Sequence, residues 1–209
     1  RSKVSGLTNY LVVNPRLAGD SQIVAVIEQL QKGKNIKVIL LEDLEKALKS
    51  YNIAIGDDTD KIALMLQRAN ILLQLDSLDK ALNDYNHILR QEPTNSSALF
   101  FRANIYTEQD KYDKAKEDYL RLLSLEPNND NVKLGLALLY KEERKYNESL
   151  TLLTLLIEEN PAVAEYYIAR SNVERLMGHN ELALMDVEKA IELEPENGNH
   201  YTLQARLLE

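Results

Sequence analysis

The sequence has no cysteine and no tryptophan, and its 209 residues include only seven glycines, five prolines, three histidines and two phenylalanines. The absence of cysteine excludes disulfides, thiolate metal sites and thiol catalysis. The scarcity of glycine and proline argues against long irregular loops. No run approaches the roughly 18 consecutive apolar residues of a membrane-spanning helix, so we predict no membrane span.

The chain also has fewer positively charged residues than negatively charged ones. The chain has 25 lysines and arginines against 33 aspartates and glutamates, which gives a formal net charge of −8. Nonspecific nucleic-acid binding depends on neutralising phosphates with lysine and arginine, so we expect no nucleic-acid partner. Hydrophobic residues make up 44% of the chain and charged residues 28%, as in a folded, soluble protein.

Residues that carry out chemistry are sparse. His87, His179 and His200 are far apart in the sequence, and none has the spacing of a metal site. There is no glycine-rich phosphate loop and no nucleophile elbow. We therefore expect no catalytic residue, no metal, no cofactor and no enzyme activity.

The sequence does contain a period of 34 residues. The clearest columns at this interval are prolines, at Pro93, Pro127, Pro161 and Pro195. One column of small residues comprises Ala69, Ala103, Ala137 and Ser171. Another comprises Ala47, Ala81, Ala115, Ser149 and Ala183. A fixed period of this size predicts stacked copies of one supersecondary unit.

Apolar spacing predicts two helices of about 13 residues in each repeat. In the repeat that ends near Pro127, Leu99, Ala103 and Tyr106 form the buried stripe of a first helix, and Ala115 and Tyr119 belong to a second. The proline ends the second helix, because the residue before a proline is pushed out of the α region. Two helices approach closely only where side chains are short, so the small columns predict where the helices cross.

These columns resemble the tetratricopeptide repeat family. The resemblance includes Asp-Lys-Ala at 79–81 and 113–115 and Leu-Glu-Pro at 125–127 and 193–195, although the family's frequent tryptophan is missing. The chain is most similar to uncharacterised bacterial proteins of this family. The resemblance implies an all-α fold, a right-handed α-α superhelix of stacked helix-turn-helix repeats, and a non-catalytic protein-protein interaction scaffold. It leaves a bacterial cytoplasm and a periplasm both open.

The resemblance also divides the chain. Residues 28–209 form the predicted repeat domain, with a degenerate repeat at 28–61 and a capping helix at 198–209. The full repeats, numbered one to four, are residues 62–95, 96–129, 130–163 and 164–197. In the degenerate repeat, Gly33 interrupts the first helix, and Leu41 to Leu48 parallels the start of the second helix in repeat one. Residues 1–27 fit no column and stay unassigned; Asp20 or Ser21 predicts the start of a helix through Leu30.

Two charged columns change together. Repeats one, two and four carry an arginine in the first helix and an aspartate in the second, whereas repeat three carries Leu136 and Leu152 there. Because both charges disappear from the same repeat, we predict ion pairs within repeats. The pairs are Arg68–Asp84, Arg102–Asp118 and Arg170–Asp186, with an apolar Leu136–Leu152 contact in repeat three. The alternative is that these are ordinary solvated residues.

Another face of the first helices predicts a peptide groove. Its apolar column is Leu66, Phe100, Leu134 and Ile168, and its polar residues are Asn70, Asn104, Thr107, Lys141, Asn172 and Arg175. Asparagine side chains offer donors and acceptors to a peptide backbone, and the resemblance implies a protein or peptide partner of unknown identity.

Three alternatives to the groove stay open. These columns could serve only packing within the stack, residues 1–27 could occupy the groove, or the chain could be a self-associating structural module that forms a homo-oligomer. Some family members clamp a terminal carboxylate, but Leu66, Phe101 and Gly135 replace residues of that clamp here, so a chaperone tail is not the expected ligand.

Overall fold

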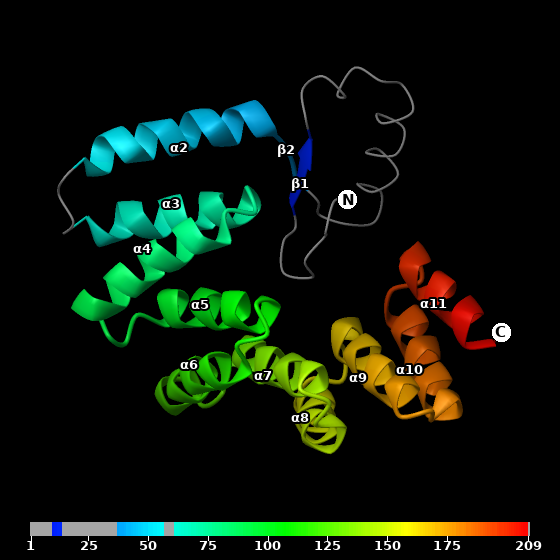
Figure 1. Ribbon diagram of the computed structural model, residues 1–209. Helices are drawn as coiled ribbons and strands as arrows, with labels where there is room; N and C mark the ends of the chain where they lie inside the picture. The colour runs from blue at the N-terminus through cyan, green and yellow to red at the C-terminus, as the bar shows by residue number, and fades with distance from the viewer. Residues whose placement is uncertain (1–9, 14–36, 57–60, 209) are drawn as a thin grey trace. The chain divides into compact units, whose positions relative to one another are not determined.

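The computed structural model describes residues 10–13, 37–56 and 61–208 (Figure 1). The chain divides into two compact units, residues 1–93 and residues 94–209. The helix predicted to run through Leu30 lies outside the described residues. Of the helices that the structure describes, none combines the length and the apolar character needed to cross a membrane.

In the first unit the structure describes two short strands before the helices. β1 (Tyr10–Val13) pairs in parallel with β2 (Lys37–Leu40). β2 leads directly into α2 (Leu41–Ile55), and the hairpin of α3 (Ile62–Gln74) and α4 (Leu78–Gln91) follows. The strand β2 differs from the first helix expected in the degenerate repeat, and its Val-Ile-Leu sequence suits a strand.

Helix α2 has the place of a second helix. It packs against the following first helix, α3, and buries Leu44 and Ile55, which are 5% and 3% exposed. Its Ala47 and Tyr51, in the columns that face a first helix of the same repeat, are only half-buried. The side of α2 away from α3 is therefore incompletely covered.

The second unit consists of three hairpins and a further helix. The hairpins are α5 (Ser96–Glu108) with α6 (Tyr112–Leu125), α7 (Asp130–Glu142) with α8 (Tyr146–Glu159), and α9 (Ala164–Leu176) with α10 (Asn180–Leu193). The last helix, α11 (Gly198–Leu208), packs against α10. The predicted pattern of two helices per full repeat is confirmed.

Small residues lie where the two helices of each hairpin cross, as predicted. Ala103 of α5 and Ala115 of α6 are fully buried. In the next two hairpins a serine replaces one alanine, and its hydroxyl donates a hydrogen bond to the partner helix. Ser149 donates to the carbonyl of Ala137 at 2.7 Å, and Ser171 donates to the carbonyl of Ala183 at 2.8 Å. The buried hydroxyls are thereby satisfied, so the close crossing is kept.

The turn inside each hairpin contains one residue with left-handed backbone geometry. These residues lie 34 positions apart, at Asp76 (φ 55°), Asp110 (φ 57°), Arg144 (φ 60°) and Gly178 (φ 83°). The amide of the next residue bonds back to the first helix, as Lys145 N does to Tyr140 O at 2.8 Å. This is a Schellman ending, and it reverses the chain between the two helices.

Arg144 is the poorest fit to this geometry, because a left-handed conformation costs a side chain other than glycine, asparagine or aspartate about 1 kcal/mol. Arg144 is exposed. We expect Arg144→Gly to raise the free energy of unfolding by about 0.5–1 kcal/mol in urea denaturation. The matched control is Gly178→Arg, which should lower it, since a Cβ there meets no atom within 4 Å and only backbone strain is added. A loss of stability in Arg144→Gly would contradict this account.

The three predicted ion pairs are confirmed. In each, the arginine Nε and Nη2 donate to the two carboxylate oxygens at 2.7–2.8 Å: Arg68–Asp84, Arg102–Asp118 and Arg170–Asp186. The aspartate side chains are 4–8% exposed and the arginine side chains 19–24%. The pKa of each arginine is raised, chiefly by its hydrogen bonds to the aspartate. The interpretation as ordinary solvated residues is wrong.

Two of these arginines also reach the second helix of the preceding repeat. Nη1 of Arg68 lies 3.2 Å from Asn52 Oδ1, and Nη1 of Arg170 lies 3.4 Å from Thr154 Oγ1. The arginine therefore links its own hairpin to the helix before it. In repeat three, Leu136 is buried and Leu152 half-buried, and their mutual contact stays a prediction.

One core column contains a charge. Met65, Leu99 and Tyr167 are buried at this position in the other repeats, whereas repeat three has Lys133, which is 6% exposed. The ammonium of Lys133 contacts the carboxylate of Glu159, and Asp130 lies 3.7 Å away. The buried lysine is therefore neutralised within its own hairpin, as a charge in a core must be.

Candidate functional site

The predicted groove residues all lie on first helices. Leu66 and Asn70 belong to α3 of the first unit, where both are half-buried, and Asn70 Oδ1 accepts a hydrogen bond from Tyr85 Oη at 2.8 Å. The other eight lie on α5, α7 and α9 of the second unit. There, α7 contacts both α5 and α9, so the three first helices are neighbours (Figure 1).

Asn104 of α5 is the most unusual polar residue of this face. Its Oδ1 accepts a hydrogen bond from the hydroxyl of Tyr119 on α6. Its Nδ2 is buried and has no hydrogen-bond partner among the residues that the structure describes. Burial raises the pKa of Tyr119 well above its usual value, so the phenol stays protonated and donates. The Asn104 side chain is thus held through its oxygen, with two N–H donors unused.

Phe100 lies one turn before Asn104 and is half-buried. Its ring meets the ring of Tyr119 edge-on, with centroids 6.2 Å apart, and that of Phe101 at 5.6 Å. Aromatic rings favour this arrangement, and it fixes the orientation of Phe100. An anchored, partly exposed phenyl ring therefore lies beside the unused donors of Asn104.

The apolar column is more deeply buried in the later repeats. Leu134 is 5% exposed and belongs to the hydrophobic core around α7, α8 and α9, against which Ile168 also packs. Asn172 donates from Nδ2 to the carbonyl of Ile168 at 2.9 Å, one turn back on its own helix. Leu134 and Ile168 thus take part in packing. Asn172 bonds to its own helix, unlike Asn104, so the asparagine column is not uniform.

The remaining polar residues lie toward the ends of the first helices. Thr107 donates to the carbonyl of Ala103 at 3.0 Å, and Lys141 pairs with Glu142 at 2.8 Å. Arg175 is exposed. Within the second unit, the residues that the structure brings into one cluster are thus Phe100 and Asn104, joined through Tyr119.

Sequence reasoning missed the role of Gly135. A Cβ built on Gly135 of α7 would lie 2.8–3.0 Å from the Tyr119 ring. The absence of a side chain therefore makes room for the tyrosine that holds Asn104. The sequence gives no consistent signal for this contact, because the column of Gly135 also holds Phe101, where the preceding repeat has Tyr85, and Ala169, where the preceding repeat has Leu153.

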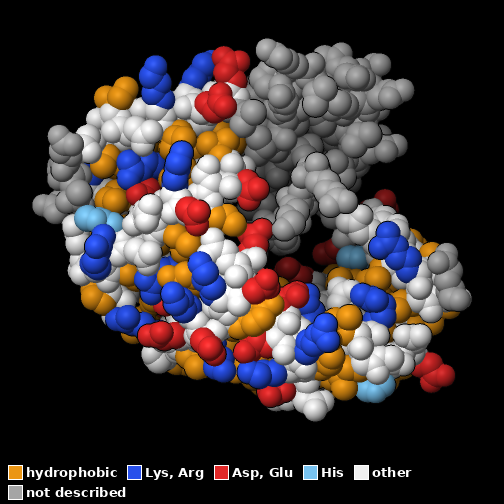
Figure 2. All heavy atoms as spheres, viewed as in Figure 1, with side chains coloured by type: hydrophobic (Ala, Val, Ile, Leu, Met, Phe, Trp, Pro, Cys, Tyr) orange, Lys and Arg blue, Asp and Glu red, His pale blue; other side chains and the backbone are white. Residues whose placement is uncertain are grey.

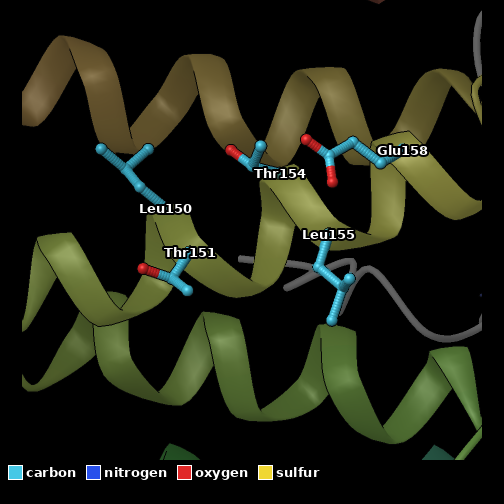
Figure 3. Close-up of a pocket in the computed structure, with 5 residues that line it drawn as sticks. All are labelled: Leu150, Thr151, Thr154, Leu155 and Glu158. Atoms are coloured by element: carbon cyan, nitrogen blue, oxygen red, sulfur yellow. The ribbon is translucent and has the colours of Figure 1, made fainter.

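A surface depression of about 530 Å³ lies elsewhere, and all of its lining residues belong to α8. It is lined by Leu150, Thr151, Thr154, Leu155 and Glu158. Figure 3 shows these side chains in two rows along the helix, with Leu150, Thr154 and Glu158 in one row and Thr151 and Leu155 in the other. None of the predicted groove residues takes part in it.

Charges of both signs are interspersed over the visible face of the described residues (Figure 2). Within residues 10–13, 37–56 and 61–208, no group of three or more histidines and carboxylates has the arrangement of a metal site. The described surface thus offers mixed polar and apolar contacts.

Comparison with known proteins identifies the repeats. Residues 96–129 and 164–197 each match a model of the tetratricopeptide repeat. No curated protein sequence is significantly similar to the chain.

Solved structures share the fold. A tetratricopeptide repeat protein from Parabacteroides merdae is 27% identical and superposes with a TM-score of 0.74, over 92% of this chain and 73% of that one. MamA from Desulfovibrio magneticus is 16% identical, with a TM-score of 0.67, over 86% of this chain and 98% of that one. YrrB, described as a tetratricopeptide repeat protein with an unusual peptide-binding site, is 18% identical with a TM-score of 0.59, over 77% and 82%.

The matched segments have the bounds of repeats two and four, and the structural likeness confirms the predicted all-α fold class of stacked helical hairpins. Residues 96–129 and 164–197 are therefore tetratricopeptide repeats, and the chain shares the fold of solved tetratricopeptide repeat proteins.

Proposed function

We propose that this chain is a non-catalytic interaction scaffold that binds a peptide or helix of a partner protein on the first-helix face of the second unit. The observation that carries the proposal is the unused Nδ2 donor of Asn104 beside the partly exposed ring of Phe100. A buried donor without an acceptor costs about 1–3 kcal/mol, and a ligand carbonyl would recover that free energy.

The chemistry suits an extended or helical peptide. Phe100 offers an apolar contact for a side chain of the ligand, and Asn104 offers a donor to a backbone carbonyl. Because Nδ2 is buried, a carbonyl would reach it only with a shift of a neighbouring side chain. Peptide binding by YrrB, a structural neighbour, agrees with such a use of the fold.

The test is an array of peptides that vary in apolar anchor residues, followed by fluorescence anisotropy with the best binder. We expect Phe100→Ala and Asn104→Ala each to weaken binding about tenfold or more, as for central interface residues.

The matched control is Asn172→Ala, which removes the corresponding asparagine of repeat four, whose Nδ2 is already bonded to Ile168. This variant should bind as the wild type does. Thermal melts of all variants separate loss of binding from loss of folding. Unchanged binding in folded Phe100→Ala and Asn104→Ala variants would rule out this face as the site.

A further inference from the structure

Each first helix of the second unit carries one stripe of residues that belongs to the predicted groove. The members of a stripe are spaced by four and then three residues, so they share one side of the helix. The stripes are Phe100, Asn104 and Thr107 on α5, Leu134, Leu138 and Lys141 on α7, and Ile168, Asn172 and Arg175 on α9. On α7 and α9 the last member, in the last turn of the helix, is a cation.

The stripes of α7 and α9 do not repeat the polar chemistry of Asn104. Leu138 stands in the asparagine column of α7 and packs against the hydrophobic core. Asn172 is engaged through Nδ2 with the carbonyl of Ile168 on its own helix. What these two helices offer a ligand instead is the charge of Lys141 and of Arg175.

Both cations are open to a new partner. Arg175 is exposed, and its side chain makes no hydrogen bond or ion pair with another residue of the described part of the chain. Lys141 pairs at 2.8 Å with its neighbour Glu142, whose side chain is 50% exposed. Exposed pairs of this kind contribute little, so a ligand carboxylate can replace Glu142.

The nearby carboxylates lie off the basic part of the stripes. Glu108 and Glu142 directly follow Thr107 and Lys141, and one residue along a helix turns the side chain by about 100°. Glu165 lies in the first turn of α9, about 15 Å along the helix from Arg175. Acidic groups of a ligand are therefore favoured at the last turns of α7 and α9.

The spacing of the first helices suits one backbone conformation of the ligand. Helix α7 contacts both α5 and α9, and packed helices lie about 8–10 Å apart. A polyproline II segment has three residues per turn and rises about 3.1 Å per residue, so residues three apart share a side and lie about 9 Å apart. In a β-strand, residues three apart point to opposite faces.

The hydrogen bonding of Asn104 agrees with the same conformation. Its Oδ1 already accepts from the hydroxyl of Tyr119, so Asn104 offers a ligand donors only. A polyproline II backbone makes no internal hydrogen bonds, and its carbonyls are free to accept. A helical ligand uses most of its carbonyls internally. Prolines in the ligand would lose nothing here, because proline lacks only the N–H.

We infer that the ligand of this face is an acidic polyproline II segment of a partner protein. An apolar residue contacts Phe100, and aspartates or glutamates three and six residues away from it pair with Lys141 and Arg175. Each pair is a charge-assisted hydrogen bond between side chains. The inference rests on the proposed function, because it names the ligand of the same site.

The experiment is fluorescence anisotropy with two synthetic peptides at low salt. One has a leucine followed by glutamates three and six residues later, with prolines and alanines between them, and the other has the same residues in reverse order. We expect one of the two to bind about tenfold more tightly than its counterpart with glutamine for glutamate, since each exposed ion pair contributes about threefold. Added salt should remove most of this advantage, because it screens exposed charges.

A shift of register provides the control among the peptides. The control peptide has its glutamates two and five residues from the leucine and keeps the same composition. In the polyproline II conformation these side chains do not point to the side of the leucine. It should therefore bind no better than the glutamine peptide.

Protein variants test the two cations. Lys141→Gln and Arg175→Gln should each weaken binding of the glutamate peptide about threefold and leave the glutamine peptide unaffected. Arg175→Glu should weaken it further, and a peptide with lysine for the outer glutamate should recover that loss. The matched control is Lys189→Gln, a lysine of α10 that pairs with Glu192 at 2.7 Å, and it should bind as the wild type does. Thermal melts accompany each variant, because a cation in the last turn also stabilises its helix.

The outcomes separate this inference from the proposed function. Equal affinity for the glutamate, glutamine and shifted peptides, with binding still lost in Phe100→Ala, would overturn the acidic ligand and leave the binding face standing. The same holds if neither peptide binds where the best peptide of the array does. Binding that does not respond to Phe100→Ala in a folded variant would overturn both.

Discussion

Replacing Arg102 with leucine is expected to lower the free energy of unfolding by about 3–5 kcal/mol, because it leaves the Asp118 carboxylate buried without its partner. The Asp118 side chain is 4% exposed, and both of its oxygens accept from Arg102. Asp118→Leu should cost less, since the Arg102 side chain is 19% exposed and keeps some contact with water. Urea denaturation of the purified variants measures both values.

The double variant Arg102→Leu/Asp118→Leu should lose far less stability than the sum of the two single changes. Repeat three already has leucine in both columns, at Leu136 and Leu152, and it forms the same hairpin. A pair of well-packed apolar residues replaces a buried ion pair at little cost. Additive losses in the double-mutant cycle would show that the two side chains are not coupled.

Tyr119→Ala should lower the free energy of unfolding by about 3–5 kcal/mol, the usual range for removing a large buried aromatic ring. The ring is 2% exposed, contacts Phe100 edge-on and donates a hydrogen bond to Asn104. Tyr119→Phe keeps the ring and removes only the hydroxyl, so its cost should be about 1 kcal/mol. Equal losses in the two variants would contradict a dominant role of ring packing.

Because Tyr119 contacts Gly135, we expect the effect of Gly135→Ala on the free energy of unfolding to change sign when Tyr119 is replaced by a smaller residue. Gly135→Ala should destabilise the wild type by about 1–3 kcal/mol, because the new methyl overlaps the tyrosine ring, although alanine is the better helix former. In a Tyr119→Leu background the same change should be neutral or stabilising. That double variant reproduces the Leu153 and Ala169 pair of the next repeat. A loss of stability in both backgrounds would argue against the steric explanation.

The ion pairs were predictable because repeats provide an internal comparison. Three repeats keep both charges and one loses both, so the partners had to lie in the same repeat. The close crossings were predictable for a related reason, since only short side chains permit them and the alanine and serine columns mark them in every full repeat.

The parts that escaped prediction depend on single repeats. The tyrosine that holds Asn104 has a counterpart in Tyr85 but not in repeat four, where Val187 takes its place and Asn172 bonds to its own helix. A column of asparagines alone therefore predicted more uniform chemistry than the structure has. The strand β2 was missed because a repeat-based alignment assigns the period of its neighbours to a segment that does not share it.

In repeat three, Lys133 of α7 favours α8 over other helices as the partner of α7. The position that holds its partner Glu159 is occupied by Gln91, Leu125 and Leu193 in the other full repeats. If α7 folded against α6 or α10 instead of α8, the ammonium would be trapped against leucine, at the cost of an unpaired charge in a core. A single lysine thus penalises swapped partners among helices that are otherwise nearly interchangeable.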